Sequence, residues 1–521
     1  MSALPWPEEK PFAQGDGAYE MIKAFLSGEA HEMEHSELER LLEEKGRELV
    51  RLLLQEHLNQ RRPGETTGPV RDREGETRTA ATEHTRSVES IFGTLELTRA
   101  GYPSEGKDSL HPLDATLNLP DEKYSLEVRR RVAIEAAKGS FDEGVKTLET
   151  YTGAHVPKRQ FEELTMRAAQ DFEAFYADRQ SRACEDPGKG SVLVLSVDGK
   201  GIVMLPEDLR ESTRKAAAER NDAFTARLGR GRRMNAKRMA SVASIYTAER
   251  SVRTPEQILP EQKPQEVAKR PQPENKRVWA SLERSPEEVI TAMFEEALHR
   301  DPERQKYWIA VVDGNETQIN LLLRLAKERN VVVPIVVDFI HVAEYVWEAA
   351  KALVPGDQMQ QDRWVRDHLL EILRGKASTV AAGMRRSATF REMKAEERKP
   401  IDDCADYLLK YAGFLNYHEM LAVGAPIATG VIEGACGYLV EARMNRSGAR
   451  WSLTGAEAVL RLRALRASGD FDAYWKFHER QEYQRNHAAK YADQHVPDVV
   501  TPPGSKSKSK KKPYGGLEII K

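Results

Sequence analysis

The sequence is poor in cysteine, with three residues, Cys184, Cys404 and Cys436, in a chain of 521. They lie far apart, and none forms a Cys-x-x-Cys pair with another. The sequence therefore predicts neither a disulfide framework nor a cysteine-based zinc module.

The chain also lacks a long apolar run. No stretch approaches the roughly 20 apolar residues needed to span a bilayer. The first ten residues have neither the basic start nor the apolar stretch of a signal peptide. We expect a soluble, cytoplasmic protein without a membrane partner.

The chain also has no large excess of either charge, because it contains 79 Lys and Arg and 82 Asp and Glu, which gives a net charge of −3. Such a balance neither indicates nor excludes nucleic acid as a partner, so only the local distribution of charge is informative. A chain of this length exceeds one simple core, and two or three domains are expected.

The N-terminal region, residues 1–185, is predicted to be mainly helical with one β-hairpin. Apolar spacing is helical over residues 18–61, and residues 85–102 alternate around a Phe92-Gly93 turn. Three helical segments follow within residues 125–176, and they have the outline of a helix-turn-helix with Lys158 and Arg159 near the start of the third. A small helical bundle without a DNA-binding role is the alternative.

The middle of the chain alternates between strands and helices. Strands are predicted at residues 191–197, 201–205, 239–247, 307–312 and 331–337, and residues 254–275 are predicted to be a linker. This order predicts a mixed sheet flanked by helices. An all-helical segment, 343–421, and a final helix, 429–443, follow, and the chain ends in a basic tail.

Carboxylates stand where two apolar strands are predicted to end. Asp198-Gly199 follows the first strand and Asp313-Gly314 the fourth, and Glu433 lies on the final helix. A buried strand holds a carboxylate in a fixed place, and carboxylate oxygens are ligands that Mg²⁺ prefers. Three such groups can hold two ions for phosphoryl transfer. The order of elements is the outline of a ribonuclease-H-like fold with a helical insertion.

Asp338 and His341 form a second pair of candidates just past the fifth predicted strand. Their i, i+3 spacing allows both to face one cleft, where His341 could contact a phosphate or orient a metal ligand. The alternative is a histidine packed at a helix start. Asp338 also ends a strand, so it competes with Asp313 for the place of second metal ligand.

Two basic segments could contact DNA. The first lies between the second and third predicted strands and contains Arg230, Arg232 and Arg233; a solvated charged segment is its alternative. The second follows the glutamate and consists of Arg443, Arg446, Arg450 and Trp451. Trp451 could stack on an unpaired base or be a buried packing residue.

Several of these motifs occur together in one order. They are Pro112-Leu-Asp-Ala-Thr-Leu-Asn-Leu-Pro120, Ser196-Val-Asp-Gly-Lys200, Val336-Val-Asp-Phe-Ile-His-Val342, Gly430-Val-Ile-Glu-Gly434 and Asn445-Arg-Ser-Gly-Ala-Arg-Trp-Ser452. Over about residues 18–468 the chain resembles the ISKra-type family of bacterial insertion-sequence transposases, DDE enzymes related to the Mutator-like group.

The resemblance implies a DDE transposase that cuts transposon ends and joins the 3′-OH to target DNA. It assigns Asp198, Asp313 and Glu433 as catalytic ligands of two Mg²⁺ or Mn²⁺ ions, and Asp338 and His341 as the Asp-x-x-His motif. The implied partners are inverted-repeat and target DNA and at least a second copy of the chain, in the bacterial cytoplasm and near the nucleoid. The implied domains are a DNA-binding region (1–185), a catalytic core (190–342 and 428–470), a helical insertion (343–427) and a C-terminal helix with a basic tail (471–521).

Two rival functions remain open on the sequence. One is a ribonuclease-H-like nuclease that cuts DNA without joining it. The other is a DNA-binding protein that derives from a transposase and has lost catalysis. The complete set of two aspartates and one glutamate favours an active enzyme over the second rival.

Overall fold

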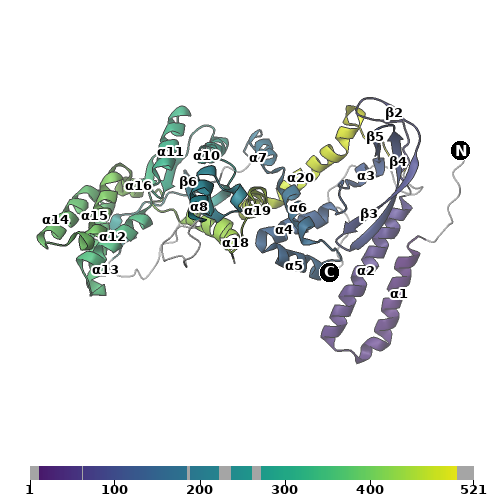
Figure 1. Ribbon diagram of the computed structural model, residues 1–521, viewed down its shortest axis with the longest axis horizontal. Coiled ribbons are helices and arrows are strands. Elements are labelled where there is room, and N and C mark those ends of the chain that lie inside the picture. Colours follow the sequence, from purple (N-terminus) through teal and green to yellow (C-terminus); the bar gives the residue numbers. More distant parts are fainter. Residues whose placement is uncertain are drawn as a thin grey trace. The chain divides into compact units, whose positions relative to one another are not determined.

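The chain folds into two compact units in a computed structural model (Figure 1) that describes residues 11–61, 63–184, 188–221, 236–260, 272–446 and 448–500. The first unit comprises Met1–Asp171 together with Trp475–Lys521, and the second comprises Phe172–Tyr474. The segment from Trp475 onward thus belongs to the same unit as the N-terminal region, a return of the chain that the sequence prediction did not include.

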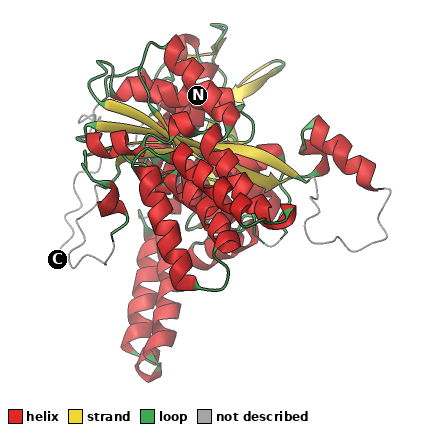
Figure 2. Ribbon diagram, turned by 90° about the vertical axis from the view of Figure 1, so that its left-hand side faces the viewer, coloured by secondary structure: helices red, strands yellow, loops and turns green. Residues whose placement is uncertain are grey.

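The first unit begins with a helical hairpin, α1 (Ala13–Ser27) and α2 (His35–Gln60), whose helices lie side by side in Figure 2. The Glu56 carboxylate near the end of α2 accepts hydrogen bonds from the backbone N–H groups of Gln14 and Gly15, both at 2.9 Å. These N–H groups have no partner within a helix, and a carboxylate also suits the positive end of the helix dipole. Glu56 therefore fixes the start of α1 against the end of α2.

A three-stranded antiparallel sheet follows in the order β3-β4-β5, formed by β3 (Thr82–Ser90), β4 (Gly93–Ser104) and β5 (Lys107–Leu110). Ser90 pairs with Gly93 across the turn, and Gly93 has a φ of 124°, which favours glycine. The predicted β-hairpin is confirmed. A small ladder, β1 (Val70–Arg71) and β2 (Thr77–Arg78), and helix α3 (Pro112–Leu117) complete this part.

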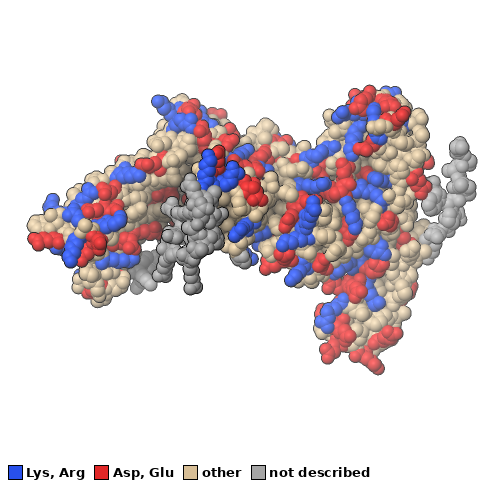
Figure 3. Space-filling model, in the orientation of Figure 1, with Lys and Arg blue, Asp and Glu red and all other residues tan. Residues whose placement is uncertain are grey.

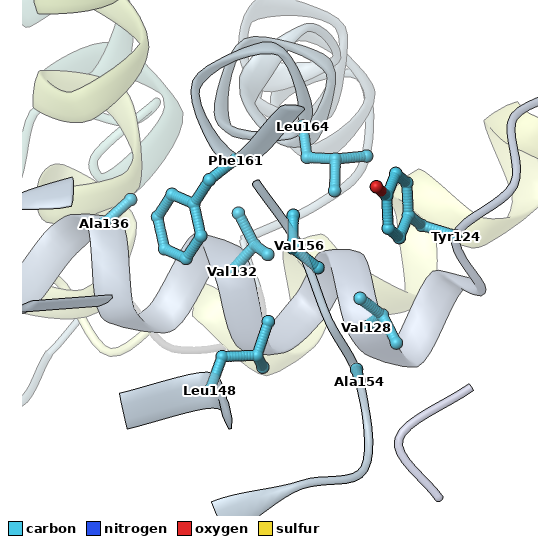
Figure 4. Packing of buried hydrophobic residues seen from close by; sticks show 9 residues of the cluster. All are labelled: Tyr124, Val128, Val132, Ala136, Leu148, Ala154, Val156, Phe161 and Leu164. Atoms are coloured by element: carbon cyan, nitrogen blue, oxygen red, sulfur yellow. The ribbon is translucent and has the colours of Figure 1, made fainter. Parts of the chain in front are cut away.

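Three helices form a separate core of the first unit, α4 (Leu126–Lys138), α5 (Phe141–Tyr151) and α6 (Lys158–Ala169). Ser125 and Ser140 cap α4 and α5 with their side-chain oxygens. Figure 4 shows the buried side chains between the helices, with Phe161 of α6 among those from α4 and α5. The three predicted helical segments are confirmed, and the third is divided into α6 and α7 (Phe172–Gln180).

The second unit contains a five-stranded mixed sheet in the order β10-β9-β6-β7-β8. Strands β6, β7 and β8 are antiparallel neighbours, whereas β9 runs parallel to β6 and β10 parallel to β9. The strands are β6 (Val192–Val203), β7 (Lys237–Ala248), β8 (Glu274–Ser281), β9 (Tyr307–Val312) and β10 (Ile335–Val337).

Two predicted strands were wrong in place. Strand β6 does not end at Asp198 but continues to Val203, so the predicted second strand at 201–205 is largely the second half of the first. Asp198 pairs with Val242 and Gly199 with Ser241, and this long-range pairing outweighs the turn preference of an Asp-Gly sequence. The predicted strand at 239–247 is confirmed as β7, whereas β8, most of which lies beyond the predicted linker, was not predicted.

The predicted all-helical block follows the sheet in the sequence. The block contains five helices that pack on one another: α12 (Phe339–Leu353), α13 (Gln358–Leu373), α14 (Ala377–Phe390), α15 (Ala395–Lys410) and α16 (Tyr417–Val423). The predicted final helix is confirmed as an unbroken helical run that consists of α17 (Gly430–Ala435), a π-helical segment (Cys436–Glu441) and α18 (Ala442–Met444).

The remaining helices complete the two units. They are α8 (Glu211–Asn221), α9 (Pro255–Ile258), α10 (Pro286–Arg300), α11 (Glu316–Glu328), α19 (Leu453–Ala467), α20 (Phe471–Asn486) and the short 3-10 turns Glu29–Glu32, Pro206–Asp208, Ala412–Phe414, Ala488–Lys490 and Ala492–Gln494. Within the described ranges, no helix has the length and apolar character that crossing a membrane requires. Acidic and basic side chains are interspersed on the face shown in Figure 3.

Candidate catalytic site

Asp198 and Asp313 stand at the same level on neighbouring parallel strands. Leu195 of β6 pairs with Ala310 of β9, and each aspartate lies three residues beyond its member of this pair. Neighbouring strands lie about 4.8 Å apart, and residues in register point to the same side of a sheet. The register therefore brings together two carboxylates that are 115 residues apart in sequence.

Asp338 extends this row by one strand. Val312 of β9 pairs with Val337 of β10, and the N–H of Asp338 donates to the Val312 carbonyl at 2.8 Å. Asp313 and Asp338 each follow a member of that pair directly. Three aspartates thus occupy one level across β6, β9 and β10.

Glu433 approaches this row from α17. One carboxylate oxygen of Glu433, one of Asp338 and one ring nitrogen of His341 all lie within 4.8 Å of one another. The Thr429 hydroxyl lies within hydrogen-bond distance of Asp338 Oδ2 and 3.2 Å from Glu433 Oε1. Thr429 therefore links the glutamate to the third aspartate.

Asp338 is fully buried and hydrogen-bonded at both oxygens. Its Oδ1 accepts from the Ile340 N–H at 2.9 Å, which caps the start of α12, and its Oδ2 accepts from Thr429. Asp313 is only half-buried, and its Oδ1 accepts from the Asn315 N–H at 3.0 Å. Asp313 is therefore the more accessible of the two carboxylates that compete for the place of second metal ligand.

His341 is part of this cluster and does not fit the packing alternative well. Its Nδ1 lies 3.9 Å from Asp338 Oδ2, too far for a hydrogen bond, and is buried with no hydrogen-bond partner in the described part of the chain. A neutral imidazole nitrogen is a common ligand for metal ions, and buried polar atoms normally have partners.

The π-helical segment that follows α17 is tied to β6 by two contacts. The Cys436 thiol donates to Asp198 Oδ2 at 3.0 Å, and Lys200 Nζ lies 2.9 Å from Glu441 Oε1. Cys436 opens the π-helical segment, a form that is frequent at functional sites. These contacts fix the strand of the first aspartate to the helix that carries Glu433.

The helical block holds the loop that follows Asp313. Tyr407 donates to the Asp313 carbonyl at 3.3 Å, and Tyr411 donates to the Gly314 carbonyl. Gly314 has a φ of 96°, and a Cβ at this position would lie 3.0 Å from the Tyr407 hydroxyl oxygen. Glycine is required here because the backbone is left-handed and closely covered.

The electrostatics of the site favour a bound cation. Burial and the neighbouring Asp198 raise the pKa of Asp313, although the Asn315 N–H opposes them. Burial and the hydrogen bond and charge of Asp338 raise the pKa of Glu433. Carboxylates crowded in this way repel one another, and a divalent cation relieves the repulsion. The hard oxygen donors fit Mg²⁺ or Mn²⁺.

A second group of possible metal ligands lies in the first unit, but arginines already neutralise it. Asp171, His478 and Glu482 are buried together, with Asp171 Oδ2 2.7 Å from His478 Nδ1. Arg129 lies 2.7 Å from Glu482, and Arg485 lies 2.5 Å from Asp171. This cluster is a buried ion-pair network that fastens α20 to the helices of its unit.

The first group of candidate DNA contacts is exposed but paired with acids. Lys158 Nζ lies 2.8 Å from Asp142 Oδ2, and Arg159 Nε lies 3.2 Å from Glu163 Oε1. Arg230, Arg232 and Arg233 lie outside the described residues.

The segment after Glu433 divides into buried and exposed residues. Trp451 is 6% exposed and donates its indole N–H to the Met444 carbonyl at 3.0 Å, and Arg443, also buried, lies 4.6 Å from the centre of its ring. The two form a packed pair, which favours the packing alternative for Trp451. Arg446 and Arg450 are exposed.

Sequence reasoning missed Thr429, Cys436, Tyr407 and Tyr411. For the first two a signal existed, because they lie four residues before and three residues after Glu433, and such spacings share one face of a helix. The tyrosines gave no signal, since they reach Asp313 and Gly314 from almost 100 residues away in the sequence.

Comparison with known proteins gives little. No protein-family model matches the chain. No curated protein matches it either. One solved structure that does match is the Drosophila P element transposase strand transfer complex, with 9% identity and a TM-score of 0.24 over 66% of this chain and 79% of that chain. A TM-score of this size is too low to establish a shared fold. The resemblance to the ISKra-type family rests on the sequence motifs alone.

Proposed function

We propose that the chain is a DDE transposase, which cuts transposon-end DNA and joins the 3′-OH to target DNA. The observation that carries the proposal is the row of Asp198, Asp313 and Asp338 at one level of three parallel strands, β6, β9 and β10, with Glu433 close to it. The order of the sheet supports a ribonuclease-H-like core, because three antiparallel strands are followed by two that run parallel to the first.

Asp198, Asp313 and Glu433 would hold two Mg²⁺ or Mn²⁺ ions. Such ions, when bound, activate the attacking oxygen and stabilise charge on the leaving oxygen of a phosphodiester. The chain supplies their positions: β6 and β9 fix the two aspartates, and α17 carries the glutamate. Asp338 keeps both oxygens in local hydrogen bonds and positions Glu433 through Thr429.

The decisive experiment measures cleavage of duplex DNA taken from the two flanks of the gene. We expect Mg²⁺-dependent nicking by the wild-type chain, loss of nicking with a chelator, and at least about a thousandfold loss in Glu433→Gln, because a metal-held carboxylate acts on transition-state charge. Glu344→Gln, the same change at an exposed position of α12, is the control. Equal nicking activity of the wild type and Glu433→Gln would refute the proposed enzymatic activity.

A second measurement separates transposition from simple nuclease activity. Products that contain flank DNA joined to a supercoiled target plasmid support the transposase, and hydrolysis without joining supports the nuclease. DNA binding without metal-dependent cleavage supports the inactive DNA-binding protein.

The two competing aspartates can be separated by metal binding. We expect Asp313→Asn to abolish tight Mn²⁺ binding in a titration followed by electron paramagnetic resonance. Asp338→Asn should retain most of it while lowering the cleavage rate, because its carboxylate positions Glu433. The reverse pattern would make Asp338 the second ligand.

A further inference from the structure

The helical hairpin of the first unit leaves many apolar side chains uncovered. In Figure 1 the hairpin (purple) extends away from the β3–β5 sheet. None of the 26 residues of α2, all of which the structure describes, is buried, although the helix contains eight leucines. An amphipathic helix normally buries its apolar side, and a large exposed apolar surface marks a place where another segment binds.

The two helices of the hairpin run antiparallel. A Cβ on Gly15, near the start of α1, would lie 2.4 Å from Leu53, near the end of α2. Phe25, near the end of α1, lies beside the middle of α2, because the Lys45 ammonium is 5.7 Å from the centre of its ring. These two contacts define the line along which α1 and α2 touch.

Four exposed apolar side chains lie on one side of this contact line. A helix turns by about 100° per residue, so Tyr19 and Leu26 lie about 40° and 20° past Gly15, and Val50 lies about 60° past Leu53 in the same rotational sense. Two antiparallel right-handed helices bring such residues to the same side of the pair. We call Tyr19, Leu26, Val50 and Leu53, which are 52%, 37%, 39% and 37% exposed, the hairpin flank.

The charge of the hairpin limits what can cover this flank. Residues 13–60 contain eleven Asp and Glu but only five Lys and Arg. By the same helical spacing, the charged side chains on the side of the hairpin flank are those of Asp16, Lys23, Glu39 and Glu43. Lys23 lies 3.1 Å from Glu20, and Glu43 lies 2.9 Å from Arg47, but such exposed pairs are weak. A second copy of the hairpin would bring the same excess of negative charge, so a basic partner fits better.

The described chain ends next to the hairpin and points toward it. Thr66 pairs antiparallel with Val499, and the Val500 N–H donates to the Glu65 carbonyl at 2.7 Å. Because this pairing is antiparallel, the chain leaves Val500 in the direction of Gln60, where α2 ends.

The next segment of the sequence, residues 501–521, lies outside the described residues and has the composition that the hairpin flank requires. It contains six lysines and one glutamate, and its apolar residues include Tyr514, Leu517, Ile519 and Ile520. Fully extended, it spans about 70 Å, whereas α2 is about 39 Å long, so it can reach any part of the hairpin. Residues 1–10, which precede α1 and also lie outside the described residues, contain two glutamates and one lysine and lack this basic excess.

We propose that residues 501–521 dock on the hairpin flank of the same chain. Their apolar residues cover the flank, and the lysines within 506–512 lie beside Glu39 and Glu43. Individual contacts of this kind are weak, but a short tether gives the segment an effective concentration of about millimolar, so weak contacts suffice. The surface belongs to the first unit, and the proposal does not depend on transposase activity.

The first test is carbodiimide crosslinking of the full chain without DNA, because this reagent joins lysine amines to carboxylates that are in contact. A mixture of ordinary and ¹⁵N-labelled chains distinguishes crosslinks within one chain from crosslinks between chains in mass spectrometry. We expect residues 506–512 to be joined to Glu39 and Glu43 within one chain. Glu37 and Glu44 are exposed on the opposite side of α2 and should react less. Equal reaction of the two pairs, or crosslinks mainly between chains, would overturn the proposal.

Hydrogen exchange measures the cover itself. In the full chain with all five lysines of 506–512 changed to glutamine, the amides of α1 and α2 should exchange about fivefold faster or more, because protection depends on local opening and α2 has no buried residue. The amides of α4 should exchange at an unchanged rate. Equal exchange of the hairpin in this variant and in the wild type would overturn the proposal.

Two matched double variants test the side of the hairpin. Glu39→Gln with Glu43→Gln should accelerate the exchange of α1. Glu37→Gln with Glu44→Gln removes the same charge from the opposite side of α2 and should leave the exchange of α1 unchanged. Equal effects of the two double variants would count against the hairpin flank. If the first double variant does not fold, the lysine variant, which changes no described residue, still decides.

Discussion

The thiol of Cys436 donates a hydrogen bond to Asp198 Oδ2 at 3.0 Å across 238 residues of sequence. Burial and the charge of Asp198 raise the pKa of Cys436, so the thiol keeps its proton and remains a donor. The contact orients the first carboxylate of the site and joins it to the helix that carries Glu433. Cys436 is therefore a positioning residue.

Replacing Cys436 tests this role. We expect Cys436→Ala to lower DNA cleavage about tenfold, which corresponds to the roughly 1.4 kcal/mol of one hydrogen bond. Cys436→Ser should retain most of the rate because the hydroxyl also donates. The Mg²⁺ concentration at half-maximal rate should rise in the alanine variant alone. Cys404→Ala, a change at another buried thiol, is the control, and an equal loss there would mean a packing effect.

Thr429 opposes the rise in the pKa of Glu433. Its hydroxyl lowers the pKa of Glu433 against the raising effects of burial and Asp338. We therefore expect Thr429→Val, which keeps the shape and removes the hydroxyl, to move the acidic limb of the pH–rate profile to higher pH. Thr429→Ser should leave that limb in place. A uniform loss of rate without a shift would contradict this role.

The helical core of the first unit depends on a close contact between Phe161 and Gly144. A Cβ at Gly144 would lie 2.6 Å from Phe161 Cζ, and Phe161 is fully buried (Figure 4). We expect Phe161→Ala to lower the free energy of unfolding by about 3–5 kcal/mol. Gly144→Ala should also destabilise through overpacking, by about 1–3 kcal/mol. Chemical denaturation measures both, and Gly46→Ala, at an open helical position, is the control.

Acid should destabilise the second unit through Glu296. Burial alone would raise the pKa of this glutamate, but the guanidinium groups of Arg277 and Arg300 outweigh burial and hold the pKa far below its ordinary value of 4.5. A depressed pKa contributes stability above pH 4.5 that is lost as the pH falls below it. Melting temperatures from pH 7 to pH 3 should fall steeply in the wild type. The melting temperature of Glu296→Gln should be lower than that of the wild type at pH 7 and should fall less toward pH 3. Parallel melting-temperature curves would contradict this role of Glu296.

Helix positions were the most predictable feature of the chain. Apolar spacing located α4, α5 and the helical block because periodicity and capping serines report neighbours within a few residues. Strands were predictable where an apolar run was uninterrupted, as in β9. The first strand was predicted to end at Asp198-Gly199 because strand propensity depends on the partner strand, here β7, which local sequence does not reveal.

The sequence by itself determined which side chains are available for chemistry, namely the aspartates at the ends of apolar runs and Glu433 on a helix. Only the tertiary structure decided how they are used. Strand register put Asp198, Asp313 and Asp338 on one level, burial separated Asp338 from the more accessible Asp313, and packing enclosed Trp451 and Arg443. A cavity of the first unit is lined both by residues near 100 and by residues near 490. Contacts between such distant residues depend on long-range pairing and burial, which local propensity does not contain.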